Sequence, residues 1–569
     1  MKNNNNSMQE ENNSIKSIIE YFYFWEENTP DSVFLRQPFG NEWTTLTFKE
    51  AGLEARKMVT ALKKEGLQKG DHVGIYSKNC YHWVLADLAI HMGGFVSVPY
   101  YASLPKDQLK TVIDLSDLKA LFVGKIDEWG SKEEILPEGL KVIRFPHYKD
   151  NAKVTTGLDW DELIKGNEPL KENYIPNLED LWTILFTSGT TGLPKGVMHI
   201  HRSPALIMHH EKQTDWVGVF KIKDSRFFSY LPLNHAGERI GVETTAITVG
   251  GSISFVENID TFSKNLRGTQ PTLFFSVPRI WNKFYLGILS KIPKKQLDLY
   301  LKVPIVKTIV KNKILKGLGL NQCKIVATGA AITPAFLKEF YKKLDIHLIE
   351  AYGMTELCGS ITNSVDLNSP YDSVGKVVPF AELKIAPEDG EVIIKTPYMM
   401  KGYYNDPEKT NDVLKDDWMY SGDIGHITED GFVIITGRKS DAFKTSKGKY
   451  IVPNPIEETI LENDFIEQVC VVGLGLPNPI ALVQLSEDAM VLSKDIIEES
   501  CEETLEILNK ELPNYERITT MVIITKEVWS EKNNLLTPTL KIKRNEIHKT
   551  YNENYLAWFN HKDKIIWDA

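Results

Sequence analysis

The sequence has few cysteines and no long apolar run. Its five cysteines lie far apart and include no C-x-x-C pair. An odd, scattered set of this kind argues against a disulfide framework and a zinc knuckle, and it is typical of a reducing cytosol. The absence of a run of about 18 apolar residues argues against a membrane-spanning helix. We expect a cytoplasmic protein and leave open a peripheral attachment to the inner face of a membrane.

A basic charge excess is also missing. The formal net charge is −10, which argues against general nucleic-acid binding because that function needs a positive surface. The first residues, MKNNNNSMQEENNS, are polar and lack the apolar core of a signal peptide. We expect residues 1–19 to form a disordered Asn-rich tail.

What the sequence does contain is an alternation of strand and helix patterns. Residues 72–77 and 95–101 read as strands on either side of an amphipathic helix over 79–94. Further short strands are predicted at 120–125, 182–189, 252–257, 272–278, 324–331 and 346–353. This rhythm predicts an α/β fold with two mainly parallel, helix-covered sheets.

The pattern changes twice toward the C-terminus. Between about 374 and 437, short strands and many turn residues predict a small β-rich module. Beyond it a Lys-rich loop, a helix and further strands predict a small α/β domain. At 569 residues the chain exceeds one core. We therefore expect a large domain over 20–437, a hinge at 438–441 and a mobile C-terminal lid domain over 442–569.

One loop is unusually rich in phosphate-binding groups. The stretch TSGTTGLPKG, residues 187–196, follows an apolar strand and combines free backbone N–H groups with a lysine and four hydroxyls, which suit phosphate oxygens. The hydroxyls belong to Thr187, Ser188, Thr190 and Thr191. The loop is not a Walker A motif, because two residues separate Gly192 from Lys195 and Gly196 stands where the Mg²⁺-binding Ser/Thr belongs. The alternative is a flexible surface loop.

This loop resembles the phosphate loop of the acyl-adenylate-forming superfamily, the AMP-binding enzymes. Six further stretches match that family in order, over about the whole chain from residue 20. They are YLPLNHAGER (230–239), ATGAAI (327–332), EAYGMTE (350–356), YSGDIG (420–425), GRKSDAFKTSKGKYIVPNPIE (437–457) and LTPTLKIKR (536–544).

The resemblance implies a reaction in two steps. A carboxylate attacks the α-phosphate of ATP and expels pyrophosphate, and the acyl group of the resulting acyl-AMP then passes to coenzyme A. Loop donors, lysines and Mg²⁺ neutralise the phosphate charge during the displacement.

The resemblance also assigns roles to individual residues. The loop, including Gly189, Gly192 and Lys195, would hold the β- and γ-phosphates. Thr355 would contact the α-phosphate, and Glu356 would bind Mg²⁺. Gly329, Ala330, Tyr352 and Gly353 would line the adenine site, while Asp423 would bind the ribose hydroxyls with Arg438 beside it. Taken singly, Glu356 and Asp423 read as surface carboxylates and Tyr352 as a core residue; the ordered set favours the functional interpretation.

The C-terminal domain is expected to supply the catalytic lysine. Lys541 matches the family's position for it, with Lys543 or a merely solvated lysine pair as alternatives. In the family this domain rotates between the two steps. The chain departs from the pattern at the hinge, where Ser440 replaces Asp or Lys, and in the thiol-channel loop, where Lys447-Gly448 stands for a Gly-Gly pair. Gly448 would then approach the pantetheine of coenzyme A.

Three stretches, LPLNHAGER, FFSVPRIW and LLTPTLKIKR, resemble those of long-chain fatty acyl-CoA synthetases. This resemblance implies a long-chain fatty acid as the substrate. Leu540 occupies a position where many short-chain and aryl-acid relatives have glycine. His235 would lie near the acyl entrance, or else be a core histidine. Residues 291–320 carry eight lysines and one Asp among aliphatic residues, so they would form either a membrane-surface helix or an ordinary solvated face.

Three rival interpretations remain open. His199, His201, His209 and His210 cluster in the sequence and suggest a metal site, but no Asp, Glu or Cys completes a spaced ligand set. An acyl-AMP ligase could load a carrier protein acting in trans, since no carrier domain follows in this chain. A silent nucleotide- or lipid-binding module is the third. Acyl-chain length, pathway and oligomeric state are not determined by the sequence.

Overall fold

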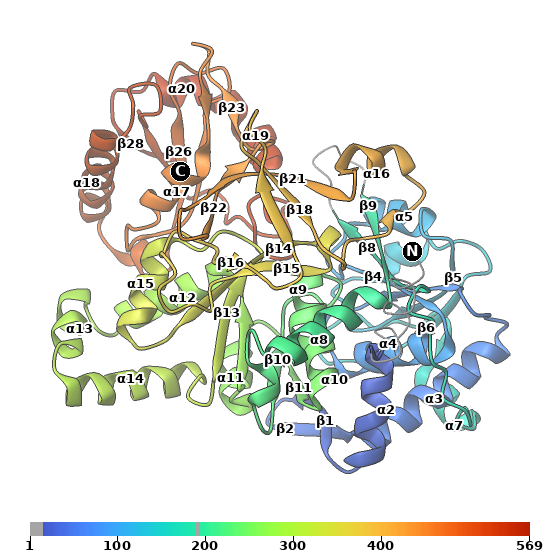
Figure 1. The fold of residues 1–569 in the computed structure, drawn as a ribbon. Helices are drawn as coiled ribbons and strands as arrows, with labels where there is room; N and C mark the ends of the chain where they lie inside the picture. Colours follow the sequence, from blue (N-terminus) through green and yellow to red (C-terminus); the bar gives the residue numbers. More distant parts are fainter. Residues whose placement is uncertain (1–14, 188–193, 569) are drawn as a thin grey trace.

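The computed structural model describes residues 15–187 and 194–568 (Figure 1). Most of the expected Asn-rich tail, residues 1–14, lies outside the described residues. Helix α2 (Ile18–Asn28) begins before the expected end of that tail, with Ser17 and Glu20 forming a capping box and Ile18 and Ile19 buried. The prediction of a disordered segment reaching residue 19 is therefore wrong at its C-terminal end. None of the described helices is both long and apolar enough to span a membrane.

The largest sheet carries the strand that leads into the candidate phosphate loop. Its order is β19-β9-β8-β4-β3-β5-β6-β7, and the pairings from β8 to β7 are parallel while β9 and β19 are antiparallel additions. The strands are β19 (Gly402–Tyr403), β9 (Lys195–Ile200), β8 (Leu181–Thr187), β4 (Val96–Tyr100), β3 (His72–Tyr76), β5 (Leu118–Val123), β6 (Lys141–Arg144) and β7 (Leu158–Asp159).

A second large sheet is built from two strand sets that meet edge to edge. One has the order β10-β11-β1-β2 and the other β12-β13-β14-β15-β16. The backbone N–H of Thr272 donates to the carbonyl of Arg226 at 2.9 Å and joins them. The strands are β1 (Val33–Phe39), β2 (Glu42–Thr47), β10 (Arg226–Ser229), β11 (Ser252–Phe255), β12 (Leu273–Ser276), β13 (Ile325–Gly329), β14 (Leu348–Met354), β15 (Gly359–Asn363) and β16 (Lys376–Val377).

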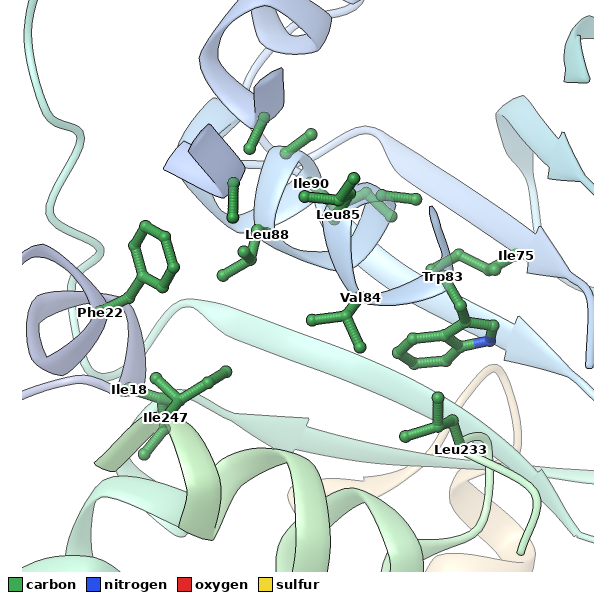
Figure 2. Packing of buried hydrophobic residues seen from close by; sticks show 14 of the residues in the cluster. Ile18, Phe22, Ile75, Trp83, Val84, Leu85, Leu88, Ile90, Leu233 and Ile247 are labelled. Carbon is green, nitrogen blue, oxygen red and sulfur yellow. The ribbon is translucent and has the colours of Figure 1, made fainter. Parts of the chain in front are cut away.

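Helix α4 (Tyr81–Gly93) packs between the two large sheets. It contacts β3 and β4 on one side and β1 on the other, and every residue after Tyr81 is buried. Figure 2 shows Trp83, Val84 and Leu88 of this helix pointing toward side chains of other elements, such as Phe22 and Leu233. The sequence predicts an amphipathic helix here, whereas the structure surrounds it with protein on all sides, so that its polar residues Asp87 and His91 are buried as well.

Other helices of the large domain connect its strands and pack against the sheets or against other helices. They are α3 (Phe48–Lys64), α5 (Lys106–Asp114), α7 (Trp160–Gly166), α8 (Arg202–Thr214), α10 (Thr245–Val249), α11 (Phe262–Thr269), α12 (Pro278–Leu289), α13 (Lys294–Leu301), α14 (Pro304–Leu318) and α15 (Ala335–Lys343). A π-helical segment, η2 (Arg239–Thr244), follows the short helix α9 (Ala236–Glu238).

The β-rich module and the C-terminal domain follow in the predicted order. The module contains β17 (Glu382–Ile385), β18 (Glu391–Lys395), β20 (Leu414–Lys415), β21 (Trp418–Ile427) and β22 (Val433–Arg438). The C-terminal domain contains β23 (Phe443–Lys444), β24 (Tyr450–Ile451), β25 (Ile466–Val472), β26 (Ile480–Leu485), β27 (Met521–Ile524) and β28 (Ile565–Asp568), with α17 (Pro453–Ile460), α18 (Lys494–Glu511), α19 (Arg544–Tyr551) and α20 (Tyr555–Phe559). Its hydrophobic clusters are separate from those of the large domain. The predicted α/β architecture is confirmed.

A buried ion pair joins α4 to the η2 segment. Arg239 Nη2 lies 2.7 and 2.8 Å from the two carboxylate oxygens of Asp87, and both side chains are almost fully buried. The guanidinium group also lies over the rings of Trp182 and Trp83, at 4.6 and 5.3 Å. Burial raises the pKa of Asp87, but the charges of Arg239 and His91 outweigh that effect and hold it below its usual value.

We predict that Asp87→Asn lowers the free energy of unfolding by about 3–5 kcal/mol, because Arg239 would remain buried without its counter-ion. The matched control is Asp127→Asn, which breaks an exposed pair with Lys78 and is expected to cost about 0–1 kcal/mol. Urea unfolding followed by tryptophan fluorescence measures both. Equal losses for the two variants would contradict the assigned role of the buried pair.

Candidate active site

One cavity of about 1710 Å³ lies where the large domain, the β-rich module and the C-terminal domain meet. Its walls bring together most of the residues singled out from the sequence, although these are spread over more than half of the chain. The lining residues include Thr187, Lys195, His235, Ala330, Tyr352, Gly353, Thr355, Glu356, Asp423, Arg438 and Lys541.

The ends of the candidate phosphate loop are held by strand pairing. Thr187 ends β8 and lies opposite Lys195 at the start of β9, so the two residues flank the loop at the cavity. The other predicted loop residues, Ser188, Gly189, Thr190, Thr191 and Gly192, lie outside the described residues. The Lys195 ammonium lies 5.0 Å from the centre of the Tyr403 ring, which keeps its charge at the cavity wall.

Tyr403 also orients the predicted metal ligand. Its hydroxyl donates to Glu356 Oε1 at 2.8 Å, and burial together with the Glu356 charge raises the pKa of this tyrosine, so that it stays a donor. The described part of the chain holds no group of three or more His, Cys, Asp or Glu side chains that could bind a metal. A single carboxylate suits Mg²⁺ that arrives with phosphate oxygens as its other ligands. Sequence analysis missed Tyr403, because no motif marks it and its partner Glu356 is distant in the chain.

His199 holds the backbone at the predicted α-phosphate contact. Its Nε2 lies 2.7 Å from the Thr355 carbonyl, and burial lowers the pKa of this histidine to about 4. The neutral ring therefore donates to the carbonyl and positions Thr355. His201 lies edge-on against His91, and His210 stacks on Phe380. Within the described ranges the histidines do not converge on a metal site, so the metal-binding alternative is wrong there.

Asp423 and Arg438 face each other across the β21–β22 hairpin. Arg438 Nε donates to Asp423 Oδ1 at 2.6 Å, and the Tyr352 hydroxyl donates to Asp423 Oδ2 at 2.8 Å. Burial and the Asp423 charge raise the pKa of Tyr352 well above its ordinary value. A flat ring and a fixed carboxylate thus lie side by side on one wall, an arrangement that suits a base and a ribose.

The glycines at this wall allow neighbouring backbone segments to approach one another closely. A Cβ at Gly353 would lie 1.9 Å from the Gly359 carbonyl oxygen, and one at Gly329 would lie 2.7 Å from that of Ala351. Ala330 adopts a left-handed conformation with φ of 69°, which is strained for a residue with a side chain and is common at binding sites. Gly329 precedes this residue but is not itself part of the cavity lining.

Lys541 reaches the cavity from a tight turn of the C-terminal domain. The Thr537 N–H donates to the Lys541 carbonyl at 2.7 Å, and the Lys541 N–H donates to Thr537 Oγ1 at 3.0 Å. Leu540 within this turn has a left-handed φ of 62° and packs against Leu231, Val277 and Ile280 of the large domain. The turn is therefore anchored across the boundary between the domains.

The surroundings of Lys541 perturb its charge. The residue is exposed at the cavity surface, with protein surrounding it at longer range. Desolvation by this surrounding protein and the charge of Arg438 lower the pKa of Lys541 to about 8, although Asp423 and Asp441 act in the opposite direction. Lys543, the alternative, also lines the cavity, and its Nζ donates to Asn534 Oδ1 at 2.6 Å.

His235 lies on the same side of the cavity as Lys541. Its Nδ1 accepts from the Gly237 N–H at 3.1 Å, so the neutral ring carries its proton on Nε2. Burial and the nearby charge of Lys541 lower the pKa of His235 to about 3. The ring is thus uncharged at neutral pH, and it lines the cavity rather than being enclosed in the core.

The segment after Arg438 is held by ion pairs, except at its centre. Lys439 lies 2.5 Å from both Asp389 and Glu391, and Asp441 lies 3.7 Å from Arg544, while Ser440 between them is exposed. Across the interface, Arg279 lies 2.9 Å from Glu467.

Gly448 lies away from these residues. It has a φ of 79° in the turn between β23 and β24, and it is not part of the cavity lining. In this arrangement of the domains, the structure does not bring Gly448 together with the other predicted site residues.

The model of the family described as AMP-binding enzyme matches residues 22–404. The chain belongs to this family. The model of the AMP-binding enzyme C-terminal domain matches residues 440–562 of this AMP-binding enzyme, and residues 405–439 lie between the two matches.

Characterised relatives cover almost all of this AMP-binding enzyme. It is 29% identical to fatty acyl-CoA synthetase A of Dictyostelium discoideum, over 90% of this chain and 85% of the relative. It is also 29% identical to long-chain-fatty-acid–CoA ligase 5 of Rattus norvegicus, over 90% and 84%. Long-chain-fatty-acid–CoA ligase FadD15 of Mycobacterium bovis is 26% identical, over 94% and 96%.

Solved structures share the fold at lower identity. The adenylation domain of a carboxylate reductase from Mycobacterium chelonae superposes with a TM-score of 0.81 at 18% identity, over 96% of this chain and 91% of that one. The anthranilate CoA ligase AuaEII, solved with anthranoyl-AMP, has a TM-score of 0.75 at 18% identity, over 95% and 98%. These matches agree with an α/β fold of a large N-terminal and a smaller C-terminal domain.

We predict that Lys541 of the AMP-binding enzyme titrates near pH 8 when no ligand is bound. Reductive ¹³C-methylation followed by NMR measures this, and Lys541→Gln identifies the signal by its loss. Arg438→Gln should raise the pKa, because a neighbouring cation is removed, and Asp423→Asn should lower it, because an anion is removed. Lys543→Gln serves as the control that leaves the signal in place. Titration near the ordinary value of about 10.4, insensitive to Arg438→Gln, would contradict the assigned environment.

Proposed function

We propose that this enzyme activates a fatty acid, preferably a long-chain one, as acyl-AMP and transfers the acyl group to coenzyme A. The observation that carries the proposal is the entry of Lys541 from the C-terminal domain into the cavity that holds Thr355, Glu356 and Asp423. Relatives named as long-chain-fatty-acid–CoA ligases, at 26–29% identity, support the choice of acid and acceptor.

In the first step, ATP would lie along the wall formed by these residues. Asp423 would accept hydrogen bonds from the ribose hydroxyls, with the adenine against Tyr352, and Thr355 would donate to the α-phosphate. Lys195 would neutralise charge on the outer phosphates. Glu356 would hold Mg²⁺, which supplies further neutralisation of the phosphate charge.

Lys541 would act where the carboxylate meets the α-phosphate. The carboxylate oxygen forms a bond to the phosphorus, and the bond to pyrophosphate breaks. An ammonium group next to both anions stabilises the charge that develops between them. With a pKa of about 8, Lys541 is mostly protonated at neutral pH, and bound anions favour that charged form further.

The second step would need the C-terminal domain to move. We propose that residues 438–441 form the pivot, since Ser440 is exposed between two ion-paired neighbours. Movement would break the Arg279–Glu467 contact and withdraw Lys541 from the cavity. The turn at Gly448, whose missing side chain leaves room beside its backbone, would then approach the pantetheine whose thiol attacks the acyl-AMP.

The acyl chain would lie against the apolar part of the cavity lining beyond His235, which we call the acyl branch. It would comprise cavity-lining side chains from α8, η2 and the strands β12–β14, among them Ile207, Met208, Ile240 and Phe275. Gly241 of η2 faces open space, because a Cβ built on it would meet no atom within 4 Å. Apolar lining next to phosphate contacts would fit a carboxylate with a long hydrocarbon chain.

The cysteines support a reducing location for this reaction. All five are unpaired, and Cys80, Cys358, Cys470 and Cys501 are buried. We propose that the enzyme works in the cytoplasm.

The overall reaction is tested by incubating the enzyme with ATP, Mg²⁺, coenzyme A and a panel of fatty acids, with product identification by mass spectrometry. Acyl-CoA and AMP formed together are expected. Acyl-AMP that accumulates unchanged by coenzyme A would instead favour a carrier-loading ligase. The absence of any acid-dependent exchange of pyrophosphate into ATP would favour a silent binding module and overturn the proposal.

We predict that Lys541→Ala slows acyl-AMP formation by about 100-fold or more, because the transition state loses its neighbouring cation. Thioester formation from supplied acyl-AMP should remain close to that of the unaltered enzyme. Pyrophosphate exchange and single-turnover thioester assays measure the two steps separately. Lys543→Ala is the matched control and should leave both steps nearly unchanged; a larger loss for it than for Lys541→Ala would reverse the assignment.

We predict that Gly241→Leu lowers kcat/KM for hexadecanoate at least about ten-fold more than for octanoate, because the new side chain fills the branch that the longer chain occupies. Gly287→Leu is the matched control, since Gly287 also lies in a helix but is exposed. Competition between the two acids in one reaction gives the ratio directly. An unchanged ratio would place the acyl chain elsewhere.

A further inference from the structure

Helices α13 and α14, with the residues just before and between them, form an arm at the edge of the molecule, which we call the lysine arm (residues 291–318). Figure 1 shows it at the lower left, away from the cavity-forming strands. The arm is attached through the buried side chains of Leu297 and Ile314, which belong to the hydrophobic cluster of the neighbouring sheet and α15. The remaining faces of the two helices are largely exposed.

The lysine arm concentrates positive charge in a chain whose net charge is −10. It contains eight lysines and a single acidic residue, Asp298. Three of the lysines have acidic partners, since Lys307 and Lys311 contact Asp345 and Lys294 contacts Asp464. The other five are exposed and make no ion pair in the part of the chain that the structure describes; these are Lys291, Lys295, Lys302, Lys313 and Lys316.

Large apolar side chains are exposed among these lysines. The exposed fraction is 61% for Leu299, 48% for Val303, 76% for Ile305 and 63% for Ile309. In α13, Leu299 lies four residues after Lys295 and three before Lys302, so the three share a face. In α14, Ile305 and Ile309 share a face with Lys313 and Lys316 by the same helical spacing. Apolar and cationic side chains therefore alternate on an exposed face of each helix.

We propose that the lysine arm docks on the surface of an anionic lipid bilayer. A bilayer offers negative headgroups to the unpaired lysines. Directly beneath the headgroups it offers an apolar layer to Leu299, Ile305 and Ile309. The aliphatic stems of the lysines allow their ammonium groups to stay at headgroup level while the neighbouring apolar side chains are buried.

Nucleic acid and an acidic protein fit this surface less well. Nucleic acid would satisfy the lysines but not the isolated apolar side chains, and the acidic remainder of the chain would repel it. An acidic protein would have to present carboxylates and apolar side chains in an alternation that matches the spacing of both helices. A fluid bilayer adapts to any such spacing. Docking would also place the enzyme where a water-insoluble acid collects; this benefit, unlike the docking itself, rests on the proposed function.

The test is co-sedimentation of the full-length protein with vesicles, at low and at high salt. One vesicle type contains only phosphatidylcholine, and the other contains one quarter phosphatidylglycerol. We expect binding to the anionic vesicles at low salt, with loss at high salt because the lysine contribution is screened.

Two sets of variants separate the contribution of the lysines to vesicle binding from that of the apolar side chains. Replacing Lys295, Lys302, Lys313 and Lys316 by glutamine should lower the partition coefficient more than about 100-fold, since each lysine contributes about five-fold. Ile305→Ser with Ile309→Ser keeps every charge and should lower it by at least about ten-fold. The matched control replaces Lys49, Lys119, Lys153 and Lys171, which are also exposed and without ion pairs in the described structure, and it should bind as well as the unaltered protein.

Three outcomes would overturn the proposal. The first is that the protein does not bind anionic vesicles, and the second is that the control set loses as much vesicle binding as the lysine-arm set. The third is that the protein is retained on immobilised polyglutamate but does not bind vesicles, which would indicate an acidic protein as the partner. Unchanged melting temperatures show that the variants are folded. Pyrophosphate exchange with octanoate, a water-soluble acid, distinguishes the two proposals: it should persist in all variants, and its absence would count against the proposed function alone.

Discussion

The candidate site depends on the balance of charge where the two domains meet. Arg438 and Lys541 place two cations at one wall of the cavity. Desolvation and then the charge of Arg438 lower the pKa of Lys541 to about 8, and Asp423 and Asp441 offset this only in part. A bound anion would favour the charged form of Lys541. In the proposed reaction, phosphate would therefore stabilise the arrangement in which Lys541 is inserted, and this would couple ligand binding to the position of the C-terminal domain.

The candidate site residues are held both by one another and by a neighbour outside the motifs. Tyr403, which no motif includes, links Lys195 to Glu356, while the motif residue Tyr352 shares Asp423 with Arg438. Burial and nearby carboxylates raise the pKa of both tyrosines, so each keeps its proton and acts as a donor. Together with His199 at the Thr355 carbonyl, these contacts orient the site before any ligand is present, which lowers the cost of ordering it on binding.

Much of the fold follows from local pattern. Short β-branched runs between helical stretches predict the parallel sheets, and the change after residue 374 predicts the β-rich module. Two local expectations fail for physical reasons. Helix α4 has a period that reads as amphipathic, yet sheets on both sides bury it, and such burial depends on elements far away in the chain. The tail predicted to reach residue 19 ends earlier, because the apolar Ile18 and Ile19 are buried and Ser17 and Glu20 form a capping box at the start of α2.

The sequence by itself determined the family and the order of its α/β and β-rich parts, because short contiguous motifs and local strand and helix patterns carry this information. The tertiary structure alone decided that Tyr403 and His199 support motif residues, that both Lys541 and Lys543 line the cavity, and that Gly448 lies outside it in this arrangement. It also decided that Leu299, Val303, Ile305 and Ile309 of the lysine arm are exposed. The supporting contacts join residues far apart in the chain, such as Tyr403 and Glu356 at 47 residues and His199 and Thr355 at 156, and no local pattern encodes such contacts.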